Sequence, residues 1–237
     1  MTYCLGMKLN GGLVAIADTR ITAGSDVYTN KKISVHEVNG ASMFIMTAGL
    51  RSIRDKSITY FKHLINDEGA TFDHMHQAAS TFGEMIKKVA SEDKRALKDE
   101  GYDFNLHTII GGQMPKDTEH KLYLIFPESN WIEINEELMF QIIGNSNFGK
   151  PIIHRTLSYD LSLKQALKIG LLSFDATRVS ANDVSFPIDV IVYEKNSFKM
   201  KVHRLTAQEL DDPLKEWSVL VKNAIGKVNE DWMKNMF

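Results

Sequence analysis

The chain has 237 residues, of which 43% are hydrophobic and 24% are charged, and its formal net charge is −2. This near-neutral balance gives no electrostatic attraction to nucleic acid or anionic lipid, and no apolar run approaches the ~18–20 residues that a membrane-spanning helix needs. Because Cys4 is the only cysteine, an intramolecular disulfide is excluded and a reducing compartment is indicated. We therefore expect a soluble cytoplasmic protein without nucleic acid or membrane partners, folded as one domain over residues 1–237.

The first half of the chain predicts two strand pairs followed by two helices. Apolar residues alternate in residues 3–9, and the turn Asn10-Gly11-Gly12 follows them. Residues 13–17 are nearly all apolar, which is typical of a strand covered on both faces. The other elements predicted in this half are a loop at 25–31, strands at 32–38 and 41–47, and helices at 50–64 and 73–96.

The second half repeats the same order, with strands first and helices after them. Ser162 is predicted to cap a helix, because Gln165 follows it at capping-box spacing. The predicted elements are strands at 104–110, 121–126, 131–135 and 140–143, helices at 148–159 and 163–180, strands at 188–194 and 198–205, and a C-terminal helical extension at about 212–237. Blocks of hairpins separated by helix pairs favour an α+β protein with two packed antiparallel sheets covered by helices, and they disfavour a parallel doubly wound sheet.

A candidate nucleophile lies at the start of the chain. Thr2 follows Met1, and a small second residue usually permits removal of the initiator methionine. Removal would expose a threonine whose α-amine, with a reference pKa of about 7.7–8.0, could act as general base to its own hydroxyl. Many proteins begin with Met-Thr by chance, so this pair of residues alone does not establish the chemistry.

Charged residues near the ends of two predicted strands support that interpretation. Asp18 and Arg20 end the apolar strand at 13–17, where a charge needs a partner, and Lys32 begins the next strand. A lysine near the Thr2 amine would lower the pKa of that amine, and an aspartate would hold the lysine in place. The alternative is an ordinary ion pair at the surface.

The chain resembles a proteasome β-subunit. The residues that carry the resemblance are Thr2, Gly11-Gly12, Ala17-Asp18-Thr19-Arg20, Thr22-Ala23-Gly24, Lys31-Lys32-Ile33 and Thr47-Ala48-Gly49. The opening MTYC, the run GNSNFGKPII at residues 144–153 and the run FPIDVIVYE at residues 186–194 narrow it to the bacterial proteasome-type proteases called Anbu, or ancestral β-subunits. The resemblance spans most of the chain.

This resemblance implies the four-layer αββα sandwich of the N-terminal nucleophile hydrolases and a threonine-type endopeptidase. By position, it implies Thr2 as nucleophile, Asp18 and Lys32 as the ion pair beside it, and Gly49 as the backbone N–H donor to the oxyanion. It implies peptides or unfolded proteins as substrates, no metal or organic cofactor, and a ring or helical assembly of identical subunits. The apolar residues of the tail, from Leu214 and Trp217 to Trp232, Met233, Met236 and Phe237, suit contacts between subunits or packing on the tail's own subunit.

Two departures leave other functions open. The family carries a Gly-Ser-Gly turn where this chain has Gly144-Asn145-Ser146, and its aspartate and serine after the fourth helix have no unambiguous match. The candidates in that region are Asp175, Ser180, Asp183 and Ser185. The alternatives are a catalytically silent proteasome-like subunit and an amidase acting on a small amide. Position alone indicates Ile21, Thr22, Thr47 and Arg51 near the specificity pocket, and Arg51 favours acidic side chains.

Two other residue groups invite a chemical interpretation. His74 and His76 suggest a metal site, but two residues apart on a helix they would diverge, so we expect no chelation. Cys4 lies on the same strand face as Thr2, and we expect it to be a small buried hydrophobic residue instead of a nucleophile.

Overall fold

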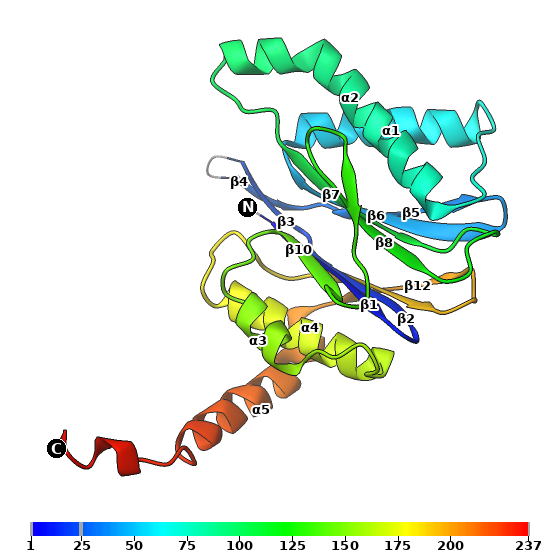
Figure 1. Cartoon of the computed structure of the whole chain (residues 1–237). Helices are drawn as coiled ribbons and strands as arrows, with labels where there is room; N and C mark the ends of the chain where they lie inside the picture. The colour runs from blue at the N-terminus through cyan, green and yellow to red at the C-terminus, as the bar shows by residue number, and fades with distance from the viewer. Residues whose placement is uncertain (1, 24–25, 237) are drawn as a thin grey trace.

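Two five-stranded antiparallel sheets lie face to face in the computed structural model of the chain, which describes residues 2–23 and 26–236 (Figure 1). Helices α1 (Arg51–Asn66) and α2 (Met75–Asp99) cover the outer face of one sheet. Helices α3 (Lys150–Thr156) and α4 (Leu163–Arg178) cover the outer face of the other. The predicted α+β class and the αββα sandwich of the N-terminal nucleophile hydrolase type are confirmed.

The first sheet has the strand order β10-β1-β2-β11-β12 and carries the start of the chain. Strands β1 and β2 of this sheet are mostly apolar and are buried along their whole length, which is the pattern of strands covered on both faces. The side chains facing α4 form one hydrophobic cluster with that helix. In sheet order, the strands span Phe140–Gly144, Tyr3–Leu9, Gly12–Asp18, Ile188–Glu194 and Met200–Leu205.

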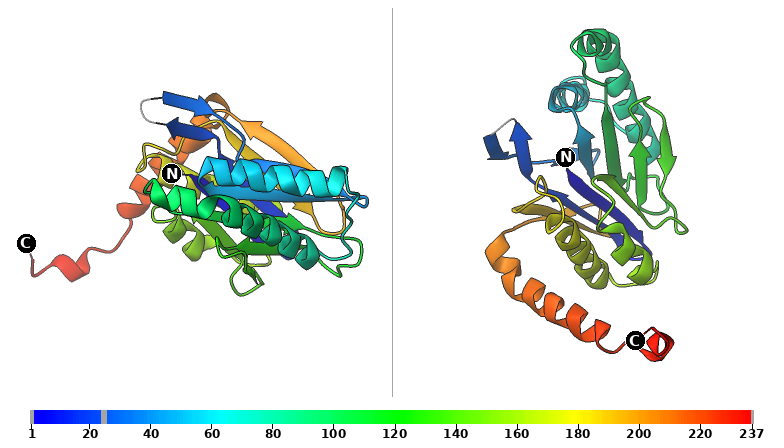
Figure 2. Two further views of the ribbon diagram at one scale, coloured as in Figure 1. Left: turned by 90° about the horizontal axis from the view of Figure 1, so that it is seen from above. Right: turned by 90° about the vertical axis from the view of Figure 1, so that its left-hand side faces the viewer.

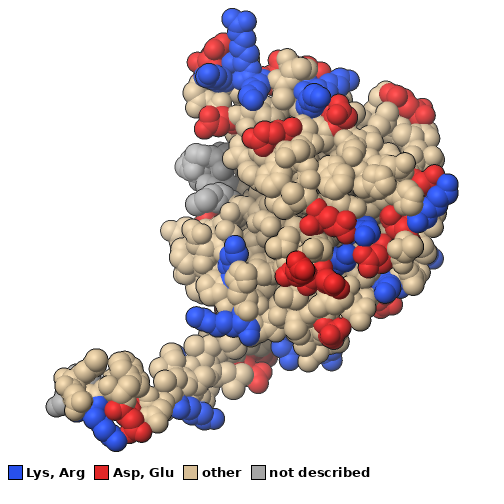
Figure 3. Space-filling view, in the orientation of Figure 1, with Lys and Arg blue, Asp and Glu red and all other residues tan. Residues whose placement is uncertain are grey.

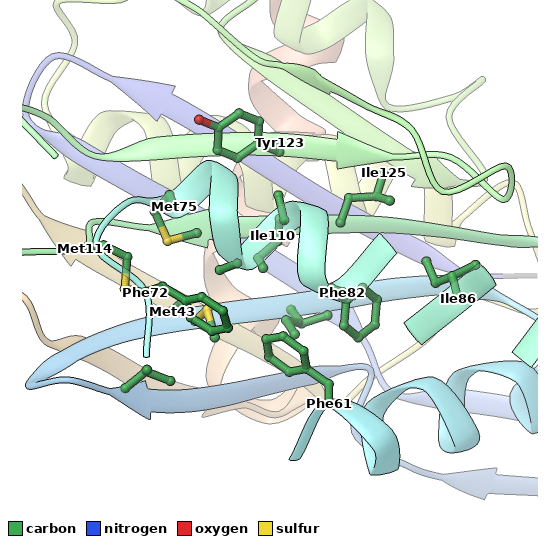
Figure 4. Packing of buried hydrophobic residues seen from close by; sticks show 14 of the residues in the cluster. Met43, Phe61, Phe72, Met75, Phe82, Ile86, Ile110, Met114, Tyr123 and Ile125 are labelled. Carbon is green, nitrogen blue, oxygen red and sulfur yellow. The ribbon is translucent and has the colours of Figure 1, made fainter. Parts of the chain in front are cut away.

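The second sheet has the order β5-β6-β7-β8-β9 and packs against α1 and α2. Phe61 of α1 and Phe82 of α2 meet edge to face, and the sheet contributes side chains such as Met43 and Ile110 to the same cluster (Figure 4). The strands span Ile33–Val38, Ala41–Gly49, Leu106–Gly112, Lys121–Ile125 and Trp131–Glu133. A third buried cluster, which includes Cys4, Ala17 and Met46, fills the space between the two sheets.

Several element boundaries differ from those predicted. Two short strands, β3 (Arg20–Ala23) and β4 (Asp26–Thr29), pair as a hairpin, and β4 lies where a loop was predicted for residues 25–31. Both strands are only four residues long, too short for a periodic pattern to stand out. Helix α2 begins at Met75, after the predicted start, because His74 is its N-cap. The predicted cap of α4 is confirmed, since Ser162 and Gln165 form a capping box.

The last helix, α5 (Ala207–Ile225), leads away from the body of the protein (Figures 1 and 2). It begins before the predicted residue 212, because Thr206 and Glu209 form a capping box, and it continues through Pro213. Only Leu210 of this helix is buried. Beyond it, the short helix η1 (Asp231–Met233) follows, and large apolar side chains stay exposed at Ile225, Val228, Trp232 and Met236. The space-filling view shows much of this projecting tail without charge (Figure 3).

Within the described residues, none of the helices combines the length and the apolar character that crossing a bilayer requires.

Candidate active site

A buried ion pair joins the end of β2 to the residue before β5. Lys32 Nζ donates to Asp18 Oδ1 at 2.7 Å, and the backbone N–H of Tyr3 donates to the same oxygen at 2.9 Å. The Asp18 and Lys32 side chains are 0% and 4% exposed, so the pair is not the surface ion pair of the alternative interpretation. Lys31, the neighbouring lysine, is exposed. Asp18 therefore holds both the lysine and the backbone directly after Thr2.

The charge of Asp18 is only partly compensated. Burial raises the pKa of the Asp18 carboxyl, and the attraction and hydrogen bond of Lys32 lower it by a smaller amount, so the pKa stays above its usual value. Among the described residues, Oδ2 of Asp18 has no hydrogen-bond partner. An ion pair in this state keeps a cation close to the start of β1 at some cost to folding stability.

The turn after β10 holds Thr2 from the other side. The backbone N–H of Asn145 donates to the Thr2 carbonyl oxygen at 2.6 Å. Gly144 has a φ of +86°, and a Cβ at this position would lie 2.0 Å from the Thr2 oxygen, so glycine is required. The Asn145 side chain is 8% exposed, and its Oδ1 has no partner in the described part of the chain.

Gly49 ends strand β6 on the opposite side of the same pocket. Its φ is +145°, and a Cβ there would lie 2.1 Å from the carbonyl oxygen of Asn105. Only glycine fits this close approach of two strands. Thr2, Lys32 and Gly49 all line one pocket of about 730 Å³. The geometry thus brings all four predicted residues together, since Asp18 lies directly behind Lys32.

Three of the four residues predicted near a specificity pocket line this pocket: Ile21, Thr47 and Arg51. The side chain of Thr22, the fourth, lies outside the described residues, as does Met1. Arg20 and Arg54 line the pocket as well. Arg54 was missed, although its spacing of three residues from Arg51 on α1 places both on one face of the helix.

Of the acidic candidates after α4, Asp183 lies near the ion pair. Burial raises the pKa of the Asp183 carboxyl, but hydrogen bonding and nearby positive charge, to which Lys32 makes the smallest contribution, outweigh this effect and leave the pKa lowered. Asp175 instead pairs with Arg178 of its own helix, at 2.6 Å. No sequence pattern distinguished Asp183, because it is the loop following α4 that carries this residue to the site. Strand β11 anchors that loop, since Ile188 is paired with Asp18 of β2.

Cys4 and the pair His74 and His76, the two other groups considered from the sequence, have structural roles. Cys4 is fully buried between the sheets, as predicted, and burial raises the pKa of its thiol, which disfavours the reactive thiolate. The expected divergence of His74 and His76 is wrong: the two rings stack with centroids 5.4 Å apart, because His74 caps the helix from outside. His74 Nδ1 contacts Asp117 Oδ1 at 3.1 Å. Within residues 2–23 and 26–236, no group of three His, Cys, Asp or Glu residues has the geometry to hold a metal ion.

Comparison with known proteins gives matches along nearly the whole chain. The family model described as Proteasome subunit matches residues 2–192. Among solved structures, the Anbu (Gly-1) mutant from Hyphomicrobium sp. strain MC1 is 30% identical with a TM-score of 0.88, covering 97% of this chain and 99% of that one. Anbu (ancestral beta-subunit) from Yersinia bercovieri is 29% identical with a TM-score of 0.86, covering 96% and 98%.

A third structure is described as the helical assembly of the Anbu complex from Pseudomonas aeruginosa. It is 28% identical with a TM-score of 0.90, and the match covers 96% of this chain and 97% of that one. Comparison with curated proteins found no match.

Proposed function

The chain belongs to the proteasome subunit family, as an Anbu-like member, and we propose that it is an N-terminal threonine peptidase that cleaves peptide bonds through an acyl-enzyme on Thr2. The observation that carries the proposal is the buried Asp18–Lys32 pair, which is bonded to the backbone directly after Thr2. Burying two charges is costly unless they are well paired. A subunit with only a scaffold role has no need of this arrangement beside Thr2.

The proposed reaction uses Thr2 for both the nucleophile and the base. The α-amine accepts the hydroxyl proton, directly or through a water, while Oγ bonds to the carbonyl carbon of the peptide. The positive charge of Lys32 lowers the pKa of the amine, so that more of it is neutral near pH 7. The Gly49 N–H stabilises the oxyanion, an interaction typically worth about 3–4 kcal/mol.

Two further steps complete the cycle, release of the amine and hydrolysis of the acyl-enzyme. The tetrahedral intermediate collapses with cleavage of the C–N bond, and the leaving amine takes the proton that the Thr2 amine had accepted. Water then attacks the ester, the amine accepts a proton from it, and the carboxylic acid leaves as Thr2 recovers its hydroxyl. The substrate is a peptide or an unfolded protein, and no metal or organic cofactor takes part.

Removal of Met1 is a requirement of this proposal. While Met1 is attached, the nitrogen of Thr2 is part of an amide and cannot act as a base. The first measurement is therefore the intact mass of the purified protein, before and after incubation with a peptide epoxyketone. This reagent adds the threonine hydroxyl to its ketone and the amine to its epoxide, with no leaving group, so the adduct has the full mass of the reagent.

We expect a chain that has lost one methionine and gains one reagent molecule. Thr2→Ala should give no adduct and no peptide cleavage with the fold intact, whereas Thr2→Ser keeps a hydroxyl and an amine and should still react. Peptide cleavage by pure Thr2→Ala would refute the proposal. A processed chain without an adduct would support the silent subunit, which the Gly144-Asn145-Ser146 turn favours, or an amidase with a small substrate.

We propose further that this cytoplasmic protein is one domain with a helical extension, and that identical subunits associate through that extension. The extension projects from the body with Val219, Leu220 and Trp232 exposed by more than half. A solved relative is described as a helical assembly of the Anbu complex. Sedimentation velocity should show an oligomer at micromolar concentration, and removal of residues 226–237 should weaken it. A monomeric full-length protein would contradict the proposal.

A further inference from the structure

Among the residues that the structure describes, every formally charged side chain that lines the pocket beside Thr2 carries positive charge. The four cations are Arg20, Lys32, Arg51 and Arg54, and no aspartate or glutamate whose side chain is described lines the pocket. The same pocket opens onto Thr47 and Gly49, next to the proposed oxyanion position. A wall of this composition attracts anionic groups and repels lysine and arginine side chains.

Carboxylates behind the wall neutralise only part of this charge. Lys32 is paired with Asp18. Arg51 and Arg54 share a single carboxylate, that of Asp55, with Nε of Arg51 at 3.2 Å and Nη2 of Arg54 at 2.6 Å. Two guanidinium groups thus face one acid, which leaves an excess positive charge at the start of α1.

Arg20 adds a donor that nothing satisfies. Its Nε is buried and has no hydrogen-bond partner within the described residues, and no ion pair of its guanidinium is seen there. A buried donor without a partner is costly, and an acceptor supplied by a ligand removes that cost. Arg20 lies on β3 and lines the same pocket as the two arginines of α1.

Arg51 is the arginine best able to reach a ligand. Its side chain is 56% exposed and its partner Asp55 is 50% exposed, so the pair between them is weak and easily exchanged. The Arg54 side chain is only 12% exposed and is bound to Asp55 through both Nε and Nη2. Arg54 therefore fixes Asp55 in place, while Arg51 is able to leave it for another carboxylate.

We propose that this pocket selects an acidic side chain, glutamate or aspartate, on the residue whose carbonyl Thr2 attacks, and that Arg51 determines this specificity. The proposal rests on the proposed peptidase function, because it assigns the substrate class of the same site. A guanidinium and a carboxylate match in geometry and form a pair of charge-assisted hydrogen bonds. An uncharged isostere such as glutamine forms weaker ones.

The test compares peptides that differ only at the attacked residue, which is glutamate, glutamine, leucine or lysine. Epoxyketones of these peptides are compared by their rate of adduct formation with the wild-type protein. In parallel, fluorescent peptide amides of the same sequences are titrated into Thr2→Ala, so that binding is measured without any chemistry. We expect glutamate to exceed glutamine by about tenfold or more in both assays, the range of a charge-assisted hydrogen bond, and lysine to be the weakest.

Variants then assign the preference to Arg51. Arg51→Gln should reduce the glutamate-to-glutamine ratio to near one, and Arg51→Glu should make lysine better than glutamate. Arg155→Gln is the matched control, because Arg155 is exposed on α3 and does not line the pocket. It should leave the ratio unchanged. A glutamine peptide with a free C-terminal carboxylate should bind no better than its amide. Binding equal to that of the glutamate peptide would mean that the pocket takes a chain terminus instead.

The two assays separate failure of this proposal from failure of the peptidase. Equal adduct rates for glutamate and glutamine would overturn the acidic specificity and leave the threonine chemistry intact. Failure of all four epoxyketones would overturn the peptidase, and the Thr2→Ala titrations would still report on the pocket. Equal or undetectable binding of all peptides in those titrations would overturn the pocket proposal.

Discussion

A buried lysine lies near each end of strand β1. One is paired with a fully buried carboxylate and the other with partly exposed carboxylates. At the first end, Lys32 faces the single carboxylate of Asp18, which is fully buried. At the other end, Lys8 bonds to Glu119 at 3.0 Å and lies 3.6 Å from Glu133. Lys121 contacts both of these glutamates, at 3.0 and 2.9 Å.

The two environments shift carboxyl pKa values in opposite directions. Burial dominates at Asp18 and raises its pKa. At Glu119 burial also raises the pKa, but hydrogen bonds from Lys121 and Lys8 outweigh it and lower the pKa to about 2. The second network balances two lysines with two partly exposed glutamates and is typical of structural stabilisation. The first places a fully buried, incompletely compensated carboxylate beside the pocket that Thr2 lines, which is typical of functional sites.

The largest expected difference between the two ends is in reactivity. Lys32→Met should reduce the rate of epoxyketone adduct formation by about 10²-fold or more, because the amine of Thr2 loses the charge that lowers its pKa. It should also cost about 3 kcal/mol of folding stability, because Asp18 is left buried without its partner. Adduct rates are followed by mass spectrometry, and stability by urea unfolding.

Lys8→Met is the matched variant at the other end of β1. Its glutamate partners are 34% exposed and remain solvated and paired with Lys121, so we expect a smaller loss of stability, about 1 kcal/mol, and an unchanged adduct rate. If Lys8→Met slowed the reaction as much as Lys32→Met, the distinction between a functional and a structural ion pair would fail.

Two glycines test the same comparison through the backbone. A Cβ on Gly144 would lie 2.0 Å from the carbonyl oxygen of Thr2, and a Cβ on Gly12, paired with the end of β1, would lie 1.9 Å from that of Tyr193. Alanine at either position should cost about 2–4 kcal/mol. Only Gly144→Ala should also slow adduct formation, by about 10²-fold, because it displaces the nucleophile. Equal adduct rates in the two folded variants would contradict this.

The sequence predicted the layers of the fold well because its strands are unambiguous. Strands β1 and β11 have the predicted bounds, since apolar residues alternate in β1 up to the turn at Asn10 and β11 is largely apolar up to the turn at Asn196. The resemblance to proteasome subunits also pointed to Asp18 and Lys32, which the fold brings to 2.7 Å. The hairpin of β3 and β4 was missed, because four-residue strands carry too little periodicity.

The composition of the pocket was harder to predict, because it depends on contacts between distant segments. Arg20 was expected to need a partner, yet its Nε has none in the described part of the chain. Whether Asp175 or Asp183 approached the site depended on the path of the loop after α4. That path is set by the pairing of Ile188 with Asp18, which local pattern does not reveal.

The pH dependence of stability should have opposite signs at the two ends of β1. The pKa of Glu119 falls from 4.5 to about 2 on folding, so its contribution is present above pH 4.5 and is lost as the pH falls toward 2. The pKa of Asp18 rises above 3.8, so its contribution is present below pH 3.8 and is lost as the pH rises through the native pKa.

Urea unfolding of three proteins checks these signs between pH 2 and pH 7. The stability of wild type relative to Glu119→Gln should rise with pH, by about 1 kcal/mol after solvent screening. The stability of wild type relative to Asp18→Asn should fall with pH. Two differences with the same sign would show that both carboxylates are compensated alike.

The smallest expected effect concerns the turn that departs from the family. Asn145→Ser keeps the backbone N–H that donates to the Thr2 oxygen and removes the Oδ1 atom that is buried without a partner. We expect a gain of about 1 kcal/mol in stability, since an unsatisfied buried acceptor is lost, and an adduct rate that rises several-fold, because the family's serine hydroxyl is restored beside Thr2. Asn10→Ser, in the exposed turn at the other end of β1, should change neither quantity. A slower reaction of Asn145→Ser would mean that the asparagine itself positions Thr2. The reactivity of Thr2 would then depend on Asn145, where the chain departs from the family pattern, as well as on the retained ion pair of Asp18 and Lys32.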